Sequence, residues 1–232
     1  MSVVNGQGEL EPVARQSTAE IIAEQLRSAI MYGSLEAGAQ LGEADLAARF
    51  GVSRGPLREA MQRLVQEGLL RAEPHRGLFV ISLEAEDVRD VYNARLAIER
   101  MACQLIMEGD RSAAVAELTA AMEGLKVAAK SRDRIAMSDA DQEFHETLVR
   151  LSGNSRLERM AHTLLVETRL CLDALQKRYP APHDLVAEHR ILVEAIAAGD
   201  TGGLLLLIEK HMADAVLRLN LPQSTVPESE PA

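Results

Sequence analysis

The stretch GVSRGPLREAMQRLVQEGLL, Gly51–Leu70, predicts a tight turn followed by an amphipathic helix whose entrance is crowded with arginine. Arg54 and Arg58 lie one helical turn apart, and Arg49 precedes the turn. Apolar residues at spacings of four and three share another face of this helix, which we expect to be buried. Those residues are Leu57, Met61 and Leu64. A helix that is anchored on one face and cationic on the other is typical of the recognition element of a helix-turn-helix.

Two further helices are expected before this stretch. Ser17 and Glu20 have the Ser-x-x-Glu pattern of a capping box, which predicts the start of a helix. Residues 43–50 form a second, short helical pattern that ends at Gly51, the residue that supplies the turn. The order of two helices, a turn and a cationic helix therefore fits a helix-turn-helix domain.

A hairpin is expected after the recognition helix. Two short extended pieces, residues 69–72 and 78–82, flank a turn that contains Pro and Gly and carries Arg76 at its tip. Three helices followed by a basic hairpin predict a winged helix over residues 17–82, with the hairpin beside the DNA groove that the recognition helix enters.

Composition favours a mainly helical protein. The chain has 232 residues, of which 47% are apolar but only 3% aromatic, so aliphatic side chains must fill the core. This length suggests two domains. The net charge of −10 argues against non-specific coating of nucleic acid, but it leaves room for one basic patch.

The cysteines and the hydropathy predict a cytoplasmic protein. Cys103 and Cys171 lie far apart without a CxxC motif, so we expect buried thiols in a reducing compartment. The longest apolar run, residues 204–208, is too short to span a bilayer, and no membrane partner is expected.

The second part of the chain, residues 83–220, predicts an antiparallel bundle of six helices. A flexible arm, residues 1–16, and a disordered tail, residues 221–232, are expected at the ends because both are polar and lack periodicity. The turn residues between periodic segments place the six helices roughly at 84–107, 112–130, 133–151, 155–178, 183–198 and 203–219.

Four polar residues of this second part lie on apolar helix stripes. Asp141 and His145 are four residues apart and share one face, while His189 and His211 each interrupt a stripe of Leu, Ile and Ala. Burying such a group without a partner costs about 1–3 kcal/mol. In an antiparallel helix pair, His189 and His211 would sit at nearly the same height, roughly 12–15 Å from the connecting loop. Either a divalent metal site or a buried, hydrogen-bonded cluster would explain the pattern.

The sequence resembles a known family over nearly its whole length outside the two ends. Residues 17–82 are similar to the winged helix of the GntR transcriptional regulators, through LGEADLAARFGVSRGPLREAMQRLVQEGLL and, in the hairpin, RGLFV. Residues 83–220 resemble the all-helical ligand domain of the FadR subfamily, called FCD, in its shorter, VanR-like branch. The residues that carry this second resemblance are Arg95, Glu99, Asp141–His145, Ser152–Asn154, Glu188–His189, Ala195–Ile196, Gly199–Asp200 and His211.

The resemblance implies a homodimeric regulator controlled by a small ligand. In the family, one Asp and three His bind a divalent metal, and Asp141, His145, His189 and His211 are the matching positions. Zn²⁺ is the first expectation, with Ni²⁺, Mn²⁺ or Fe²⁺ as alternatives. A small carboxylate or sugar acid completes the metal coordination. Arg95 matches an arginine that meets the carboxylate of this effector.

The resemblance also assigns contacts to double-stranded operator DNA, and ligand-relieved repression is the expected mode of action. The matching positions are Arg49, Ser53, Arg54, Arg58, Arg76 and Gly77. The chain departs from the family at Gly55, where Thr is usual, so a hydroxyl contact to phosphate is missing.

Plainer interpretations of the same residues remain open. Arg54 and Arg58 also fit a solvated helix face, and Ser53 fits a simple N-cap. Arg95 and Glu99 have the spacing of an ordinary helix ion pair, worth about 0.3–0.5 kcal/mol on a surface.

Two other functions also compete with a ligand-controlled regulator. One is a metal-dependent enzyme built on the bundle, although no nucleophile or general base is evident beyond the four metal-ligand candidates. The other is a constitutive DNA-binding protein whose metal is only structural.

Overall fold

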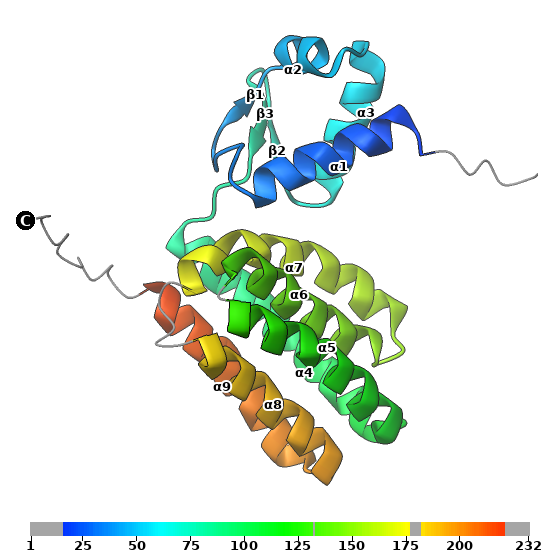
Figure 1. The fold of residues 1–232 in the computed structure, drawn as a ribbon, viewed down its shortest axis with the longest axis vertical. Helices are drawn as coiled ribbons and strands as arrows, with labels where there is room; N and C mark the ends of the chain where they lie inside the picture. Colours follow the sequence, from blue (N-terminus) through cyan, green and yellow to red (C-terminus); the bar gives the residue numbers. More distant parts are fainter. Residues whose placement is uncertain (1–15, 132, 177–181, 221–232) are drawn as a thin grey trace, which may run out of the picture.

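The computed structural model describes residues 16–131, 133–176 and 182–220, which form a small winged helix and a larger helical bundle (Figure 1). The predicted arm and tail lie outside these ranges, apart from Gln16. The mainly helical class is confirmed. None of the helices in the described part of the chain is both long and apolar enough to cross a membrane. Cys103 is a buried free thiol, as expected, whereas the side chain of Cys171 lies outside the described part.

The winged helix contains the three predicted helices and a three-stranded sheet, one strand more than the sequence suggested. Its elements are α1 (Thr18–Met31), β1 (Gln40–Leu41), α2 (Glu43–Phe50), α3 (Arg54–Gln66), β2 (Leu70–Glu73) and β3 (Gly77–Val80). The strand order is β1-β3-β2 with antiparallel pairing throughout. The missed strand, β1, has two residues and pairs Gln40 with Phe79, so it fastens the connection between α1 and α2 to the wing.

The recognition helix α3 is held by its apolar face and by glycines at its two ends. Leu57, Met61 and Leu64 are fully buried, as the spacing predicted. Gly51 adopts the left-handed conformation, with φ 65°, in the turn between α2 and α3. Gly68, with φ 79°, ends α3 in a Schellman arrangement, since Leu69 N donates to the Leu64 carbonyl at 2.9 Å.

The capping box at the start of α1 is also present. Ser17 Oγ accepts from Glu20 N at 3.1 Å, and the Glu20 carboxylate accepts from Ser17 N at 2.8 Å. These two reciprocal bonds satisfy donors that a helix start otherwise leaves free. The helix start predicted from the sequence is therefore confirmed.

The bundle contains six helices close to the predicted ranges. They are α4 (Ala85–Glu108), α5 (Arg111–Ser131), α6 (Arg134–Arg150), α7 (Ser155–Gln176), α8 (Pro182–Ala198) and α9 (Thr201–Asn220). Helix α4 packs along α7 and α9, α6 lies between α5 and α7, and α8 packs on α5 and α9. One apolar cluster that includes Phe144 and Leu148 fills the interior.

Helix α7 also contacts the winged helix, which lies above the bundle in Figure 1. Val166 is 5% exposed and belongs to the same apolar cluster as the winged-helix core, and Leu170 packs against that cluster. At the end of α3, a methyl group on Gly68 would come within 2.8 Å of Thr163 Cγ2. The two parts of the molecule therefore meet along one face of α7.

This contact predicts a difference between two glycine substitutions. Both Gly51→Ala and Gly68→Ala force a left-handed alanine, at a cost of about 1–2 kcal/mol, but only the Gly68 variant also clashes with Thr163. We expect Gly68→Ala to lower the free energy of unfolding more than Gly51→Ala does. In a double-mutant cycle measured by denaturant unfolding, Thr163→Ala should remove the excess. Equal losses in the two glycine variants, with no coupling to Thr163, would contradict the packing of α7 on α3.

Candidate functional site

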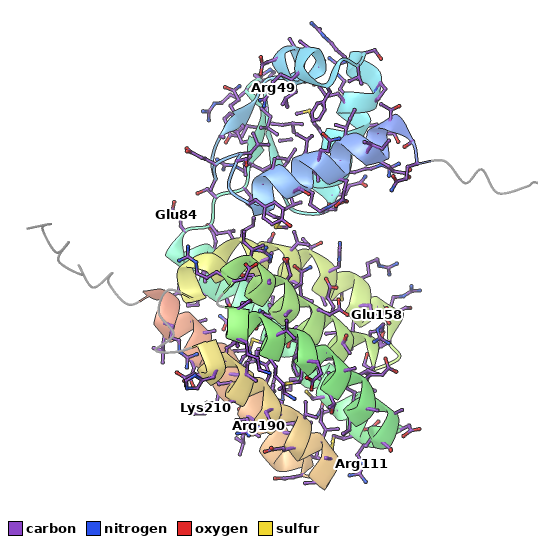
Figure 2. The ribbon with its side chains drawn as sticks, in the orientation of Figure 1. Arg49, Glu84, Arg111, Glu158, Arg190 and Lys210 are labelled. Carbon is purple, nitrogen blue, oxygen red and sulfur yellow. The ribbon has the colours of Figure 1, made fainter. Side chains whose placement is uncertain are left out.

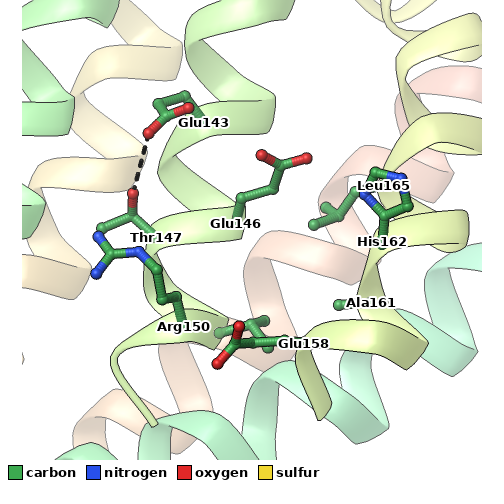
Figure 3. A pocket seen from close by; sticks show the side chains of 9 residues that line it. Glu143, Glu146, Thr147, Arg150, Glu158, Ala161, His162 and Leu165 are labelled. Atoms are coloured by element: carbon green, nitrogen blue, oxygen red, sulfur yellow. Dashed lines mark hydrogen bonds between the residues drawn. The ribbon is translucent and has the colours of Figure 1, made fainter. Parts of the chain in front are cut away.

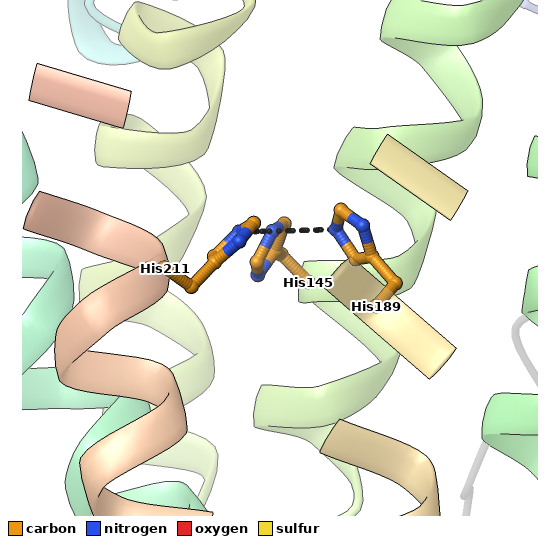
Figure 4. Close-up of side chains that lie close together, drawn as sticks. All are labelled: His145, His189 and His211. Carbon is orange, nitrogen blue, oxygen red and sulfur yellow. Dashed lines mark hydrogen bonds between the residues drawn. The ribbon is translucent and has the colours of Figure 1, made fainter. Parts of the chain in front are cut away.

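Three imidazole rings meet in the bundle core (Figure 4). His145 on α6, His189 on α8 and His211 on α9 are 1%, 0% and 8% exposed. His145 Nε2 lies 3.2 Å from His189 Nε2 and 3.3 Å from His211 Nε2. The structure brings together residues from three helices, which the sequence had placed on inward stripes, with His189 and His211 at nearly the same height.

Each of these rings turns its other nitrogen towards an acceptor. His145 Nδ1 lies 2.6 Å from Glu99 Oε2, and His189 Nδ1 lies 2.8 Å from the Leu185 carbonyl. His211 Nδ1 lies 3.3 Å from Glu188 Oε2. At His145 an acceptor at Nδ1 favours a proton on that nitrogen and leaves the Nε2 lone pair free. His189 differs because its Nε2 also lies 3.2 Å from the Asp141 carboxylate, and His211 Nδ1 makes no hydrogen bond of good geometry with any described residue. The three Nε2 atoms therefore converge on one another as potential ligands.

Asp141 adds a carboxylate to this cluster. Its Oδ1 lies 3.2 Å from His189 Nε2, and the side chain is 5% exposed. Burial alone would raise the pKa of Asp141, but the hydrogen bond with His189 and the positive charge of nearby groups hold that pKa below its usual value. The carboxylate is thus ionised at neutral pH.

The charge states of the rings follow from the same surroundings. Burial and the charge of Arg95 hold the pKa of His145 well below its usual value, and burial lowers the pKa of His211. Burial would also lower the pKa of His189, but the hydrogen bond and charge of Asp141 outweigh it and raise that pKa. The rings of His145 and His211 are therefore neutral at physiological pH, with lone pairs facing one another.

This donor set fits a divalent metal ion. Two imidazole nitrogens bound to one tetrahedral Zn²⁺ at about 2.0–2.1 Å lie roughly 3.3–3.4 Å apart, close to the two spacings in this cluster. His145, His189 and His211 would hold the ion, and the Asp141 carboxylate lies beside them, 3.2 Å from His189 Nε2. Mutually facing lone pairs repel unless a proton or a cation lies between them, so the cluster can accept a metal ion in place of a proton.

Arg95 lies buried beside this cluster rather than on the surface. Arg95 and Glu99 are 2% and 1% exposed, and Arg95 Nε donates to Glu99 Oε1 at 2.9 Å. The ion pair of the plainer interpretation is therefore present, but it is buried, and both charges are desolvated. Removing one partner of a buried pair typically costs about 3–5 kcal/mol.

The guanidinium of Arg95 also reaches α7. Its Nη1 donates to Thr168 Oγ1 at 3.2 Å. Its Nη2 is 2.8 Å from Glu99 Oε1 but forms no hydrogen bond of good geometry with any described residue. One arm of this buried cation thus retains donor capacity.

The residues matched to DNA contacts are exposed on the winged helix. Arg54 and Arg58 stand on α3, and Arg49 lies at the end of α2 (Figure 2). Arg58 Nε pairs with Glu43 Oε2 at 2.7 Å, and this exposed ion pair is weak enough for another partner to replace it. Ser53 is the N-cap residue of α3, but its side chain makes no capping hydrogen bond within the described residues, so its hydroxyl is available.

Arg76 and Gly77 are exposed in the wing. The Arg76 guanidinium pairs with Glu73 and lies over the Phe79 ring, 5.1 Å from its centre. This stacking holds the arginine at the turn of the wing, as the predicted hairpin required. The positive φ of Gly77, 102°, suits a residue without a side chain.

A second hollow, of about 230 Å³, opens between α6 and α7 (Figure 3). Its polar lining includes Glu143, Glu146, Glu158 and His162. It is separate from the three-histidine cluster, and among the described residues these three carboxylates and the imidazole form no compact metal-binding group.

Asn154 lies at the start of α7 and has a structural role, because it caps that helix by accepting from Arg156 N at 3.0 Å.

Comparison with known proteins identifies the family. Residues 18–80 match the model of the bacterial regulatory proteins of the gntR family, and residues 90–214 match that of the FCD domain. The gluconate operon transcriptional repressor of Bacillus licheniformis is 30% identical over 207 residues, which cover 87% of this chain and 85% of the relative. The chain belongs to the GntR family.

Relatives and solved structures agree with this assignment. The probable D-xylose utilization operon transcriptional repressor of Paenarthrobacter nicotinovorans is 30% identical, over 82% of this chain and 85% of the relative. The crystal structure of a GntR transcriptional regulator from Rhodococcus sp. RHA1 has a TM-score of 0.72 and 28% identity, over 88% of this chain and 98% of that one. Escherichia coli McbR/YncC shares the fold, with a TM-score of 0.71 over 88% of this chain and 98% of that one, at 24% identity.

A GntR protein that combines these two domains is a DNA-binding transcription regulator rather than an enzyme, and the winged helix is its DNA-binding module.

Sequence reasoning did not place three residues beside the histidine cluster. Glu99 was considered as an ion-pair partner of Arg95 and as part of a resemblance, Glu188 only as part of a resemblance, and Thr168 was not noticed. Their signal was weak because an acid one turn from an arginine, or beside a histidine, is common on exposed helices.

Arg58 on α3 generates the first DNA-binding prediction. We expect Arg58→Ala to lower affinity for a specific site by about 1–3 kcal/mol, the usual worth of a bidentate base contact, without unfolding the domain. Titration of a DNA fragment selected by the wild-type protein from a random pool measures this loss. Arg63→Ala is the matched control, because Arg63 lies on the same helix but pairs with Glu59 and Glu20. Wild-type affinity in the Arg58 variant would contradict the assignment.

Proposed function

We propose that this protein is a homodimeric repressor whose bundle holds one divalent metal ion and binds a small carboxylate there. Effector binding lowers affinity for the operator and relieves repression. The observation that carries the proposal is the approach of His145 Nε2 to the Nε2 atoms of His189 and His211, at 3.2 and 3.3 Å, with acceptors at the Nδ1 atoms of His145 and His189.

The choice of ion follows from the ligand atoms. Asp141 and three imidazoles form a set of one carboxylate oxygen and three nitrogens, which suits Zn²⁺, Ni²⁺, Mn²⁺ or Fe²⁺. Zn²⁺ is our first choice because a tetrahedral ion matches the nitrogen spacings. An ion held by these four groups can accept a further ligand, and a carboxylate oxygen is suitable.

The effector class has two supports. Relatives are named as repressors of a gluconate operon and a D-xylose utilization operon, which points to a sugar or sugar acid. Arg95 supplies a cation beside the cluster, and its Nη2 has donor capacity left for a carboxylate. A sugar acid would place its carboxylate between the ion and this guanidinium.

The physical link from this site to the DNA-binding part is α7. Thr168 accepts from Arg95, and Val166, two residues earlier, belongs to the apolar cluster of the winged helix. A ligand that draws Arg95 away from Thr168 acts on the helix that supports α3. A coupling of about 1–3 kcal/mol between effector and DNA is typical of such systems.

The dimer follows from the mode of DNA recognition. Helix-turn-helix proteins bind two half-sites about one helical turn apart, and a two-fold dimer supplies the two recognition helices. In this proposal the effector changes how the two winged helices are held, so that they no longer match the half-site spacing.

The metal site generates the first test. We expect about one metal ion per chain in purified wild-type protein, measured by elemental analysis, and its loss in His189→Ala. His162→Ala is the matched control, since His162 is an exposed histidine on α7. Wild-type protein that takes up no Zn²⁺, Ni²⁺, Mn²⁺ or Fe²⁺ on dialysis would contradict the metal site.

The effector role of Arg95 generates the second test. Arg95→Lys keeps the charge opposite Glu99 but loses the planar fork that recognises a carboxylate. We expect the variant to need at least about tenfold more gluconate, or another small carboxylate of a screening panel, for half-release from DNA, relative to the DNA affinity of the same protein without effector. Fluorescence anisotropy of labelled DNA measures both quantities.

The same titration also distinguishes a ligand-controlled regulator from a constitutive DNA-binding protein. A protein with bound metal whose DNA affinity responds to no carboxylate in the panel would be a constitutive DNA-binding protein with a structural ion. Release that is equally sensitive in wild type and Arg95→Lys would retain the regulator but remove Arg95 from its site.

A further inference from the structure

Glu99 connects the buried arginine to the histidine cluster. The carboxylate comes from α4 and is 1% exposed. Its Oε1 accepts from Arg95 Nε at 2.9 Å, and its Oε2 lies 2.6 Å from His145 Nδ1. Burial raises the pKa of Glu99, and Arg95 opposes that shift. Oε1 therefore faces Arg95, Oε2 faces His145, and the side chain is shielded from solvent.

We propose that Glu99 is a positioning residue that fixes the tautomer and orientation of His145, so that Nε2 carries the lone pair facing His189 and His211. This inference rests on the proposed metal site, because a metal ligand needs that lone pair. Glu99 itself contributes no atom to the converging group. Its action passes through one hydrogen bond to the ring that lies between the other two.

The three histidines differ in the acceptor that faces Nδ1. For His189 the acceptor is the Leu185 carbonyl of its own helix, which no side-chain substitution removes. For His211 it is Glu188, which is 21% exposed and also pairs with Arg218. Of the two carboxylates that face an Nδ1 atom, Glu99 is the fully buried one, so no water can take its place at His145.

Replacement of Glu99 by glutamine should reverse the hydrogen-bond polarity at His145. Arg95 has donors only, so the amide oxygen of the introduced side chain must face Arg95 and its NH₂ group must face His145 Nδ1. His145 Nδ1 then accepts a hydrogen bond from the amide, and the ring proton moves to Nε2, where it points at the other two rings. A similar exchange of carboxylate for amide beside a catalytic histidine leaves geometry intact but holds the wrong tautomer.

The test measures Zn²⁺ affinity of the full chain by competition with a chromophoric chelator. We expect Glu99→Gln to bind Zn²⁺ about 10–100-fold more weakly, the usual effect of losing an outer-shell partner. Glu99→Asp keeps the charge and acceptor atoms on a shorter side chain, so its loss should be smaller than that of the glutamine variant. Glu209→Gln is the matched control, because Glu209 pairs with Arg100 on the surface. Circular dichroism establishes that each variant is folded.

A second measurement reads the tautomer directly and needs no metal. Nitrogen-15 chemical shifts of histidine-labelled, metal-free wild type distinguish a proton on Nδ1 from one on Nε2, with His145 assigned from the signal lost in His145→Gln. We expect Nδ1–H in the wild type and Nε2–H in Glu99→Gln. A merely structural role for Glu99 would change stability without moving the proton.

The outcomes separate this inference from the proposed function. Wild type that binds Zn²⁺, with unchanged affinity and tautomer in Glu99→Gln, would overturn the role of Glu99 alone. Wild type that binds no metal would overturn the metal site, while the tautomer still decides whether Glu99 positions His145. An Nε2–H proton on His145 in the wild type would overturn the inference even if every Glu99 variant failed to fold.

Discussion

The bundle is arranged around a polar cluster that its own core cannot satisfy. His145, His189 and His211 direct three ring nitrogens at one another inside an otherwise apolar interior. A buried polar group without a partner is costly, and the low dielectric of the interior increases that cost. Acceptors at the Nδ1 atoms of His145 and His189, and the Asp141 carboxylate beside His189 Nε2, limit that cost, but His145 Nε2 and His211 Nε2 still face each other. A cation bound between the rings would remove this repulsion, so metal binding would contribute to stability.

The fold places this cluster close to the DNA-binding part through a single helix. One face of α7 meets α4 at Thr168, and another supplies Val166 to the winged-helix core. Since the two faces belong to one rigid helix, a shift at the first face moves the second. The recognition helix α3 also ends at Gly68, directly against Thr163 of α7. Orientation of α3 thus depends on packing against the bundle as well as on its own core.

Periodicity predicted the parts of this structure that depend on local sequence. Leu57, Met61 and Leu64 repeat at helical spacing, and they are buried for that reason. Strand β1 could not be predicted, because two residues carry no periodicity and pair with a strand more than thirty residues away. The histidines were recognisable because each breaks an apolar stripe. Glu99 was not recognisable as part of their site, because its spacing from Arg95 is the same whether the pair is buried or exposed.

The buried pair of Arg95 and Glu99 explains how one small ligand could act on two parts of the protein. Without ligand, the guanidinium is shared between Glu99, which holds His145, and Thr168, which belongs to α7. A carboxylate that binds the Nη2 arm of Arg95 draws the guanidinium towards itself, and it competes with both of these partners for the position of that group. The free energy of effector binding is then partly used to weaken existing contacts. Because linkage is reciprocal, DNA that favours the original contacts must weaken effector binding by the same factor.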